Sequence, residues 1–297
     1  MNSPSVISGV PQTIGQWHCR DNLLAWGRRT LIMGVVNVTP DSFSDGGQFF
    51  NPTKAIRQAE RLLEQGADII DIGGESSRPG ADPVLVDEEL RRVLPSIEEL
   101  AGRQGAVVSI DTVKYEVAAR ALDEGAAIIN DISGLQHDPR LAELAAQSQA
   151  GLVIMHMRGT PRDMQTMTDY ENITNEVRAF FETQIAVAQE KGVLLNQIAV
   201  DPGIGFSKTA QQNLTLIQRA PEWIIPGCPV LAGPSRKSFI GAITETDAAD
   251  RDWGTAGAVA ACVMRGAHII RVHNVDAMRD VVDVVDAIRN GPTPTTK

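Results

Sequence analysis

The sequence predicts a single (β/α)₈ TIM barrel, an α/β fold in which eight parallel strands alternate with eight helices. Three observations predict this fold. From residue 30 onward, short β-branched apolar runs alternate with longer amphipathic stretches, which is the pattern of repeated βα units. Glycines recur where a helix is expected to end before the next strand, as at Gly66, Gly125 and Gly266. The 297 residues also suit one barrel domain, because such barrels commonly use about 250 residues.

Eight apolar runs are predicted to be the strands of the barrel. Their near-continuous hydrophobicity, as in Leu152–Met155, is typical of a parallel sheet that is buried on both faces. A doubly wound open sheet with an extra strand pair is the alternative that this pattern leaves open. The predicted strands are Thr30–Val38, Asp68–Gly74, Ala106–Asp111, Ala127–Ile132, Gly151–His156, Ile198–Pro202, Pro229–Gly233 and His268–His273.

The chain is expected to form one domain, because no linker rich in Pro, Gly or Ser divides it. We assign residues 1–29 to an N-terminal extension leading into the barrel, 30–290 to the barrel and 291–297 to a disordered tail. Residues 1–29 hold no continuous apolar block that would indicate a signal peptide or a membrane anchor. We therefore expect a cytoplasmic protein without membrane association.

Charge and cysteine content exclude several function classes. The net charge of −10 argues against nucleic-acid binding, which depends on a basic surface. Cys19, Cys228 and Cys262 are far apart and form no Cys-x-x-Cys pair, which argues against a disulfide framework or a zinc site. An anionic ligand would need a local basic pocket.

Polar side chains mark the ends of the predicted strands. In a barrel these ends converge at the catalytic face, so the side chains are expected to form a ring there. The alternative is that each polar residue merely caps the following helix, because Asp and Asn are favoured at that position. The candidates are Asn37, Asp71, Asp111, Asn130, His156, Asp201, Arg271 and His273, with Lys237 a few residues after the seventh strand.

The composition of this ring favours phosphate chemistry assisted by a hard cation. It holds no closely spaced histidine pair or thiolate cluster, which argues against catalytic zinc. Asn and Asp oxygens suit Mg²⁺, which also takes substrate phosphate oxygens. Basic residues concentrate late in the chain, in Ser235–Ser238 and Arg271–His273, where barrel enzymes often bind phosphate. The alternative for the first segment is a solvated Arg-Lys turn.

Two loops after predicted strands are rich in functional groups. The first covers Asn37–Gly47, with Phe43 as its only aromatic residue, and the second covers Gly73–Gly80. Gly-flanked loops in this position often act as lids that exclude water. The residues alone therefore indicate Mg²⁺-assisted phosphate chemistry on an unknown substrate.

At these loops the sequence resembles the dihydropteroate synthase family of pterin-binding barrels. The matching segments follow the family's order and cover about residues 30–290. They are Met33–Gly47, Asp71–Gly80, Ser109–Thr112, Ile129–Gly134, Met155–Met157, Asp201–Phe206, Gly233–Phe239 and Arg271–His273. The resemblance implies condensation of 6-hydroxymethyl-7,8-dihydropterin diphosphate with 4-aminobenzoate, which gives 7,8-dihydropteroate and diphosphate.

The resemblance also implies residue roles at the pterin and the diphosphate. A carboxylate can accept the adjacent N–H donors of a pterin edge as a pair, and Asp201 is implied in this role. Asn37 is implied near Mg²⁺ and, with Arg271 and His273, at the diphosphate. The residues implied to bind the pterin diphosphate are Asp111, Asn130, Met155, Asp201, Lys237, Arg271 and His273.

For 4-aminobenzoate, the resemblance implies a pocket closed by the two loops. Asp45 would pair with Arg78, and these two residues join Asp111 and Lys237 in the implied catalytic set. Many family members have Thr where this chain has Ser77, so inhibitor affinity is expected to differ modestly. The residues implied at 4-aminobenzoate are Phe43, Ser77, Arg78, Pro79, Phe206 and Ser238.

We infer from these implied roles that diphosphate leaves before the amine attacks, with Asp111 placed to stabilise the resulting cation. The family also implies a homodimer through the last helices. Two other functions would be compatible with pterin contacts. One is a barrel that transfers a methyl group from methyltetrahydrofolate to a corrinoid, which would not need the basic segments. The other is a catalytically silent paralogue, in which the two loops are expected to be eroded.

Overall fold

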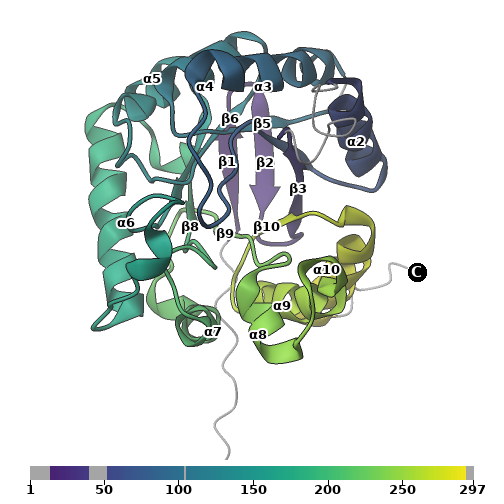
Figure 1. Ribbon diagram of the computed structural model, residues 1–297, viewed down its shortest axis with the longest axis vertical. Helices are drawn as coiled ribbons and strands as arrows, with labels where there is room; N and C mark the ends of the chain where they lie inside the picture. The colour runs from purple at the N-terminus through teal and green to yellow at the C-terminus, as the bar shows by residue number, and fades with distance from the viewer. Residues whose placement is uncertain (1–13, 40–51, 104, 292–297) are drawn as a thin grey trace, which may run out of the picture.

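The computed structural model describes residues 14–39, 52–103 and 105–291 (Figure 1). The proposed disordered tail falls outside these ranges except for Gly291, and most of the first loop, with Phe43 and Asp45, also falls outside. Among the described residues, no helix is long and apolar enough to cross a membrane.

The central sheet of the protein has eight parallel strands, as the sequence predicted. They pair in the order β8-β7-β6-β5-β4-β3-β10-β9. A parallel bridge between Val200 and Val230 joins the two ends, so the sheet forms a nearly closed barrel rather than an open doubly wound sheet. The strands are β3 (Leu31–Asn37), β4 (Ile69–Gly73), β5 (Val108–Asp111), β6 (Ile128–Asp131), β7 (Gly151–Met155), β8 (Ile198–Asp201), β9 (Leu231–Ala232) and β10 (Ile269–Val272).

Helices surround these strands (Figure 1). Helix α2 (Pro52–Glu64) buries Ala55, Ala59 and Leu62, a spacing that places its apolar residues on one face. The other α helices described are α3 (Val86–Ala101), α4 (Tyr115–Asp123), α5 (Arg140–Ser148), α6 (Ile173–Glu190), α7 (Ala210–Gln218), α8 (Ser238–Thr244), α9 (Asp252–Met264) and α10 (Val275–Asn290). Short 3₁₀ segments are η1 (Met164–Thr166), η2 (Leu195–Gln197), η3 (Ala220–Glu222) and η4 (Ala248–Asp250).

A β-hairpin precedes the barrel, in the segment that the sequence identified only as an extension. Its strands are β1 (Gly15–Cys19) and β2 (Asn22–Trp26), and they pair antiparallel. Trp17, Cys19 and Trp26 are buried against residues that enter the barrel strands, such as Leu31 and Ile269. The Trp17 indole also donates to the carbonyl of Gln197 at 2.7 Å. The hairpin thus covers the end of the barrel at which the strands begin.

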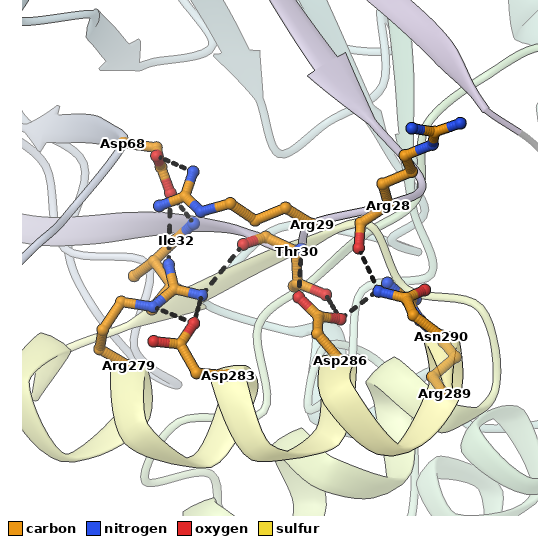
Figure 2. Close-up of polar contacts among 10 residues, drawn as sticks. All are labelled: Arg28, Arg29, Thr30, Ile32, Asp68, Arg279, Asp283, Asp286, Arg289 and Asn290. Atoms are coloured by element: carbon orange, nitrogen blue, oxygen red, sulfur yellow. Dashed lines mark hydrogen bonds and ion pairs between the residues drawn. The ribbon is translucent and has the colours of Figure 1, made fainter. Parts of the chain in front are cut away.

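At the same end, the last helix is tied to the first barrel strand (Figure 2). The Asp286 carboxylate of α10 accepts hydrogen bonds from the Thr30 backbone N–H at 2.6 Å and the Thr30 hydroxyl at 2.8 Å. Asp68 accepts from the Ile32 N–H at 2.8 Å. These polar contacts stabilise the end of the barrel at which the strands begin, whereas the active sites of such barrels lie at the carboxyl ends of the strands.

Candidate active site

The carboxyl ends of the strands bring most of the predicted ring together. Because strand register pairs Asp111 with both Gly73 and Asn130, the ends of β4, β5 and β6 lie side by side. The apolar residues of the strands fill the core, and polar residues at or near the ends of several strands lie at the barrel mouth. The ring residues that are buried are Asp71, Asp111, Asn130, His156 and Asp201, while Asn37, Lys237, Arg271 and His273 are half-buried.

Arg271 is the centre of this arrangement. Its Nε donates to Asp71 Oδ2 at 2.7 Å, and its Nη2 donates to Asp111 Oδ2 at 2.7 Å. The Asn130 amide donates to the same Asp71 oxygen at 2.9 Å. One arginine from β10 is therefore held between carboxylates of β4 and β5, and Asp71, for which the sequence suggested no role, links it to Asn130.

Asp111 is ionised with difficulty in this setting. Burial is the main cause that raises the pKa of Asp111 to about 7, and Arg271 opposes this rise. The nearby charges of Asp71 and Glu89 raise the pKa further, whereas Lys237 lowers it. The carboxylate can therefore exchange a proton near neutral pH, which is a property of groups at functional sites.

Asp201 and Lys237 lie close enough for the charge of each to affect the pKa of the other. Burial raises the pKa of Asp201 to about 6 and, with the charge of Arg271, lowers the pKa of Lys237 to about 8. The Lys237 ammonium lies 3.9 Å from the centroid of the Phe206 ring, a cation–π contact that orients the lysine. Asp201 Oδ1 accepts the Gly203 N–H at 2.7 Å.

Glycine is required in the loop that carries Phe206. At Gly205 the backbone φ is +86°, and an added Cβ would lie 2.8 Å from Lys237 Cδ. The bare backbone therefore lets the stem of Lys237 pass close to the loop. Beneath this loop, buried Lys208 donates to the Phe206 carbonyl at 2.8 Å and lies 3.0 Å from His156 Nδ1. His156 thus supports the loop.

His273 lies at the basic side of the site. Its Nδ1 is 3.0 Å from Ser235 Oγ, and its backbone N–H donates to the same oxygen at 3.3 Å. Burial, followed by the positive charges of Arg271, Arg236, Lys237 and Arg78, lowers the pKa of His273 to about 3. His273 is therefore neutral at physiological pH in the ligand-free protein.

The loop after β4 is anchored by a partly buried group of ionic contacts. Lys114 bridges Glu75 of this loop, at 2.6 Å, and Glu89 of α3. The second Glu75 contact is a hydrogen bond from the Val84 N–H at 2.7 Å, which ties the two ends of the loop together. Further along the loop, the Gly80 N–H donates to the Pro161 carbonyl at 3.0 Å. The strand pattern gave no signal for Glu89 or Lys114.

This loop carries Ser77, Arg78 and Pro79, of which Ser77 is half-buried and the other two are exposed. It borders a cavity of about 520 Å³ whose lining includes Ser76 and Ile132. Ser238, the first residue of α8, is exposed directly after Lys237. Phe206 and Met155 are buried in one apolar cluster with Met157 and Met164. The pairing of Arg78 with Asp45 and the position of Phe43 lie outside the described residues.

The site combines carboxylate and amide acceptors with the Arg271 guanidinium and the neutral His273 imidazole. Asp111, Asn130 and Asp201 present acceptors to a polar ring edge, and Arg271 and His273 present donors to an anion. Such a site can hold a heterocycle and stabilise an anionic leaving group without a protein nucleophile. Among the described residues, no group of three or more His, Cys, Asp or Glu side chains is placed to hold a metal ion.

Comparisons with known proteins are consistent with this chemistry. The family model described as pterin binding enzyme matches residues 33–273. The dihydropteroate synthase of Synechocystis sp. is 48% identical over 94% of this chain and 95% of the relative. The dihydropteroate synthase of Escherichia coli is 41% identical over 86% of this chain and 90% of the relative.

Solved structures show the same likeness. The Xanthomonas albilineans dihydropteroate synthase with 4-aminobenzoic acid is 39% identical, with a TM-score of 0.87 over 94% of this chain and 100% of that chain. The same enzyme in complex with 7,8-dihydropteroate is 37% identical, with a TM-score of 0.83 over 94% and 100%.

Proposed function

The chain belongs to the pterin-binding enzyme family, within it to the dihydropteroate synthases, which are transferases of folate synthesis, and we propose how its residues carry out that reaction. The substrates are 6-hydroxymethyl-7,8-dihydropterin diphosphate and 4-aminobenzoate. The observation that supports the proposal best is the double pairing of Arg271 with Asp71 and Asp111, because it places a cation beside Asp111, one of the proposed pterin-binding carboxylates.

The pterin is bound by the acceptors at the ends of β5, β6 and β8. Asp201 takes the paired N–H donors of the pyrimidine edge, which a carboxylate accepts with good geometry. Asn130 completes that edge, and Lys237 donates to the pterin carbonyl and ring nitrogen. Met155 and Phe206, which belong to one buried apolar cluster, bound the pocket.

The diphosphate is bound by Arg271 and His273. His273 is neutral, and the Ser235 hydroxyl donates to its Nδ1 in this proposal, so that Nε2 carries the proton and donates to a diphosphate oxygen. The Arg271 guanidinium lies next to the pterin and balances the charge of the leaving group. These preorganised donors stabilise negative charge as it develops on the diphosphate oxygen.

Diphosphate leaves before the amine attacks. The bond between the exocyclic methylene carbon and the diphosphate oxygen breaks, and its electron pair stays with the diphosphate. The resulting cation is delocalised into the dihydropterin, and the Asp111 carboxylate stabilises it. The free amine of 4-aminobenzoate then forms the C–N bond and releases a proton to water, so no protein nucleophile or strong base is needed.

The loop after β4 helps to hold 4-aminobenzoate. Ser77, Arg78 and Pro79 contact its ring or carboxylate from the loop side, and Ser238 contacts the carboxylate from the start of α8. Phe206 and the stem of Lys237 form the opposite wall. Phe43 and the Asp45–Arg78 pair complete this pocket in the proposal.

Mg²⁺ is the cofactor in this proposal, and Asn37 would be its one protein ligand. Asn37 ends β3 at the barrel mouth and offers a hard amide oxygen, and it is half-buried. Mg²⁺ commonly binds one or two protein oxygens and takes its other ligands from phosphate and water, so a lone Asn37 suffices. When bound, the ion supplies positive charge that neutralises the diphosphate.

The same helices that border the site present an apolar surface to a second copy of the chain. A groove of about 460 Å³ runs over α7, α8 and α9, and its lining includes Leu214, Phe239 and Ile243. Trp253, which is 90% exposed, lies at the start of α9. Exposed apolar patches of this kind commonly form interfaces, and we propose that this one forms a homodimer. Light scattering should give twice the chain mass, and Trp253→Asp should shift the mass toward the monomer.

The decisive experiment is a diphosphate-release assay. We expect release only when the pterin diphosphate and 4-aminobenzoate are both present with Mg²⁺. Binding of pterin without release would indicate a silent paralogue, and methyl transfer from methyltetrahydrofolate to a corrinoid would indicate the other pterin-binding reaction.

The order of steps is tested by titrating 4-aminobenzoate into the enzyme with and without diphosphate. We expect 4-aminobenzoate to bind only when diphosphate is present. Tight binding of 4-aminobenzoate to the empty enzyme would contradict that order.

A further inference from the structure

We propose that Asp71 is a positioning residue of the reaction, which holds Arg271 and Asn130 in the orientations in which they meet the pterin diphosphate. This inference rests on the proposed roles of Arg271 and Asn130 and adds a residue that contacts neither substrate. It is carried by the geometry around a single carboxylate oxygen.

That oxygen, Asp71 Oδ2, accepts two hydrogen bonds from opposite sides of the barrel mouth. Arg271 Nε on β10 is 2.7 Å away, and Asn130 Nδ2 on β6 is 2.9 Å away. The Asp71 side chain is fully buried. Because a buried carboxylate between a guanidinium and an amide restricts the rotation of both, Asp71 sets which atoms of Arg271 and Asn130 remain for a ligand.

The remaining atoms are those that the reaction uses. The Asn130 side chain gives one amide proton to Asp71, so its carbonyl oxygen and second proton stay available to a pterin edge. Arg271 gives Nε to Asp71 and Nη2 to Asp111, which fixes the plane of the guanidinium. Loss of Asp71 would leave Asp111 as the one remaining acidic partner of Arg271 among the described residues.

Asp71 also acts on Asp111 through charge. The charged groups facing Asp111 come from four elements: Asp71 on β4, Glu89 on α3, Lys237 after β9 and Arg271 on β10. Removing the negative charge of Asp71 removes one repulsion, while the positive charges of Arg271 and Lys237 remain. The pKa of Asp111 should then fall, which gives a readout that loss of stability alone would not produce.

The test compares Asp71→Asn and Asp71→Ala with Ser109→Ala. Asn retains one acceptor oxygen, which can serve both Arg271 and Asn130, but it carries no charge. Ala removes the oxygen and the charge together. Ser109 is the matched control, because it pairs with Asp71 in the neighbouring strand and its buried hydroxyl has no hydrogen-bond partner among the described residues.

Two quantities are measured on each folded variant. The first is the affinity for unphosphorylated 6-hydroxymethylpterin by calorimetry. We expect Asp71→Ala to bind about tenfold or more weakly, as loss of charge-assisted hydrogen bonds predicts, and Asp71→Asn to bind more tightly than Asp71→Ala. The second is the pH profile of kcat/KM for the pterin diphosphate. Its acid limb should move to lower pH in Asp71→Asn by about one unit.

Ser109→Ala should match the wild type in both measurements. An acid limb that stays in place in Asp71→Asn would overturn the proposal, as would equal pterin affinities for Asp71→Ala and the wild type. These outcomes are separate from failure of the proposed function, in which the wild type itself would release no diphosphate when both substrates are present.

Discussion

Ser235 Oγ lies 3.0 Å from His273 Nδ1 and accepts the backbone N–H of His273 at 3.3 Å. Burial and the charges of Arg271, Arg236, Lys237 and Arg78 lower the pKa of His273 to about 3, so the imidazole is neutral, and we propose that the Ser235 hydroxyl donates its proton to Nδ1. The imidazole is then the neutral tautomer with its proton on Nε2. The serine thus sets which nitrogen faces the diphosphate.

This relationship predicts different effects of two substitutions at His273. The amide of Gln reaches the place of Nε2, whereas the amide of Asn reaches only the place of Nδ1. His273→Gln should therefore bind the pterin diphosphate more tightly than His273→Asn, and both should bind unphosphorylated pterin as the wild type does. Calorimetry with the two ligands measures this, and equal losses for both ligands would contradict a role at the diphosphate.

Arg271→Ala is tested with the same two ligands. Its affinity for the pterin diphosphate should fall more than its affinity for unphosphorylated pterin.

Asp201 is predicted to read the pterin edge. Asp201→Asn replaces an acceptor oxygen by an N–H₂ group that faces the donors of the pterin, so affinity for the pterin should fall by about 3 kcal/mol. The matched control is Asp283→Asn, which makes the same chemical change on α10 at a side chain that is 60% exposed. Unchanged pterin affinity in Asp201→Asn would remove Asp201 from the pterin edge.

The fold was largely predictable because the barrel strands are short apolar runs, several of which end in a polar residue. Strand β9 illustrates the limit, since Pro229–Gly233 was predicted and only Leu231–Ala232 is regular. The hairpin at Gly15–Trp26 escaped prediction because its strands are short and its burial depends on the barrel that it covers. Local pattern carries no information about such a distant partner.

The position of candidate residues at the barrel mouth was predictable where a polar residue lies at or near a strand end, as for Asp111, Asn130 and Asp201. The sequence did not indicate which side chains contact one another in the site. The Asp71–Arg271 contact joins residues 200 positions apart, and the Lys114 bridge joins a loop to a helix. These pairings arise from three-dimensional packing, so spacing along the chain does not reveal them.

The Glu75 anchor predicts an effect on 4-aminobenzoate. In Glu75→Ala the loop loses its contacts with Lys114 and the Val84 N–H, while Lys114 keeps Glu89. The KM for 4-aminobenzoate should rise several-fold and the affinity for pterin should not change, because Ser77, Arg78 and Pro79 lie on this loop. Glu116→Ala is the control, as it removes a half-exposed ion pair with Arg140. Equal effects on both substrates would show that the loop does not act on 4-aminobenzoate alone.

The contacts between Asp286 and Thr30, at the end of the barrel opposite the candidate site, predict an effect on stability alone. Asp286→Ala removes two hydrogen bonds to Thr30 and leaves the Arg289 guanidinium without that carboxylate. We expect a loss of about 3 to 5 kcal/mol in the free energy of unfolding, as for breaking a buried ion pair. Asp283→Ala on the same helix removes a partly exposed pair and should cost about 1 kcal/mol or less. Urea denaturation measures the free energy of unfolding of both variants. Similar losses in the two variants would show that burial does not determine how strongly the contacts of Asp286 stabilise the protein.

His268 predicts a dependence of stability on pH. Its Nδ1 accepts the Val230 N–H at 3.0 Å, and its ring lies edge-on to Trp26 with 4.5 Å between centroids. Burial, helped by the charge of Arg289, lowers the pKa of His268 to about 4. Since the unfolded chain has a pKa near 6.5, unfolding takes up a proton between these values. The stabilisation by neutral His268 is therefore complete above about pH 6.5 and is lost as the pH falls toward 4.

His268→Asn isolates this contribution. The Asn carbonyl can accept the Val230 N–H, but it does not titrate in this range. Between pH 7.5 and 5.5 the wild type should lose about 1.4 kcal/mol more unfolding free energy than the variant, which corresponds to one proton over about one pH unit. Other groups, such as Asp111 and Asp201, titrate in both proteins and cancel in the difference. Urea denaturation of both proteins at the two pH values measures it, and stability curves that run parallel would mean that His268 has the same pKa in the folded and the unfolded protein.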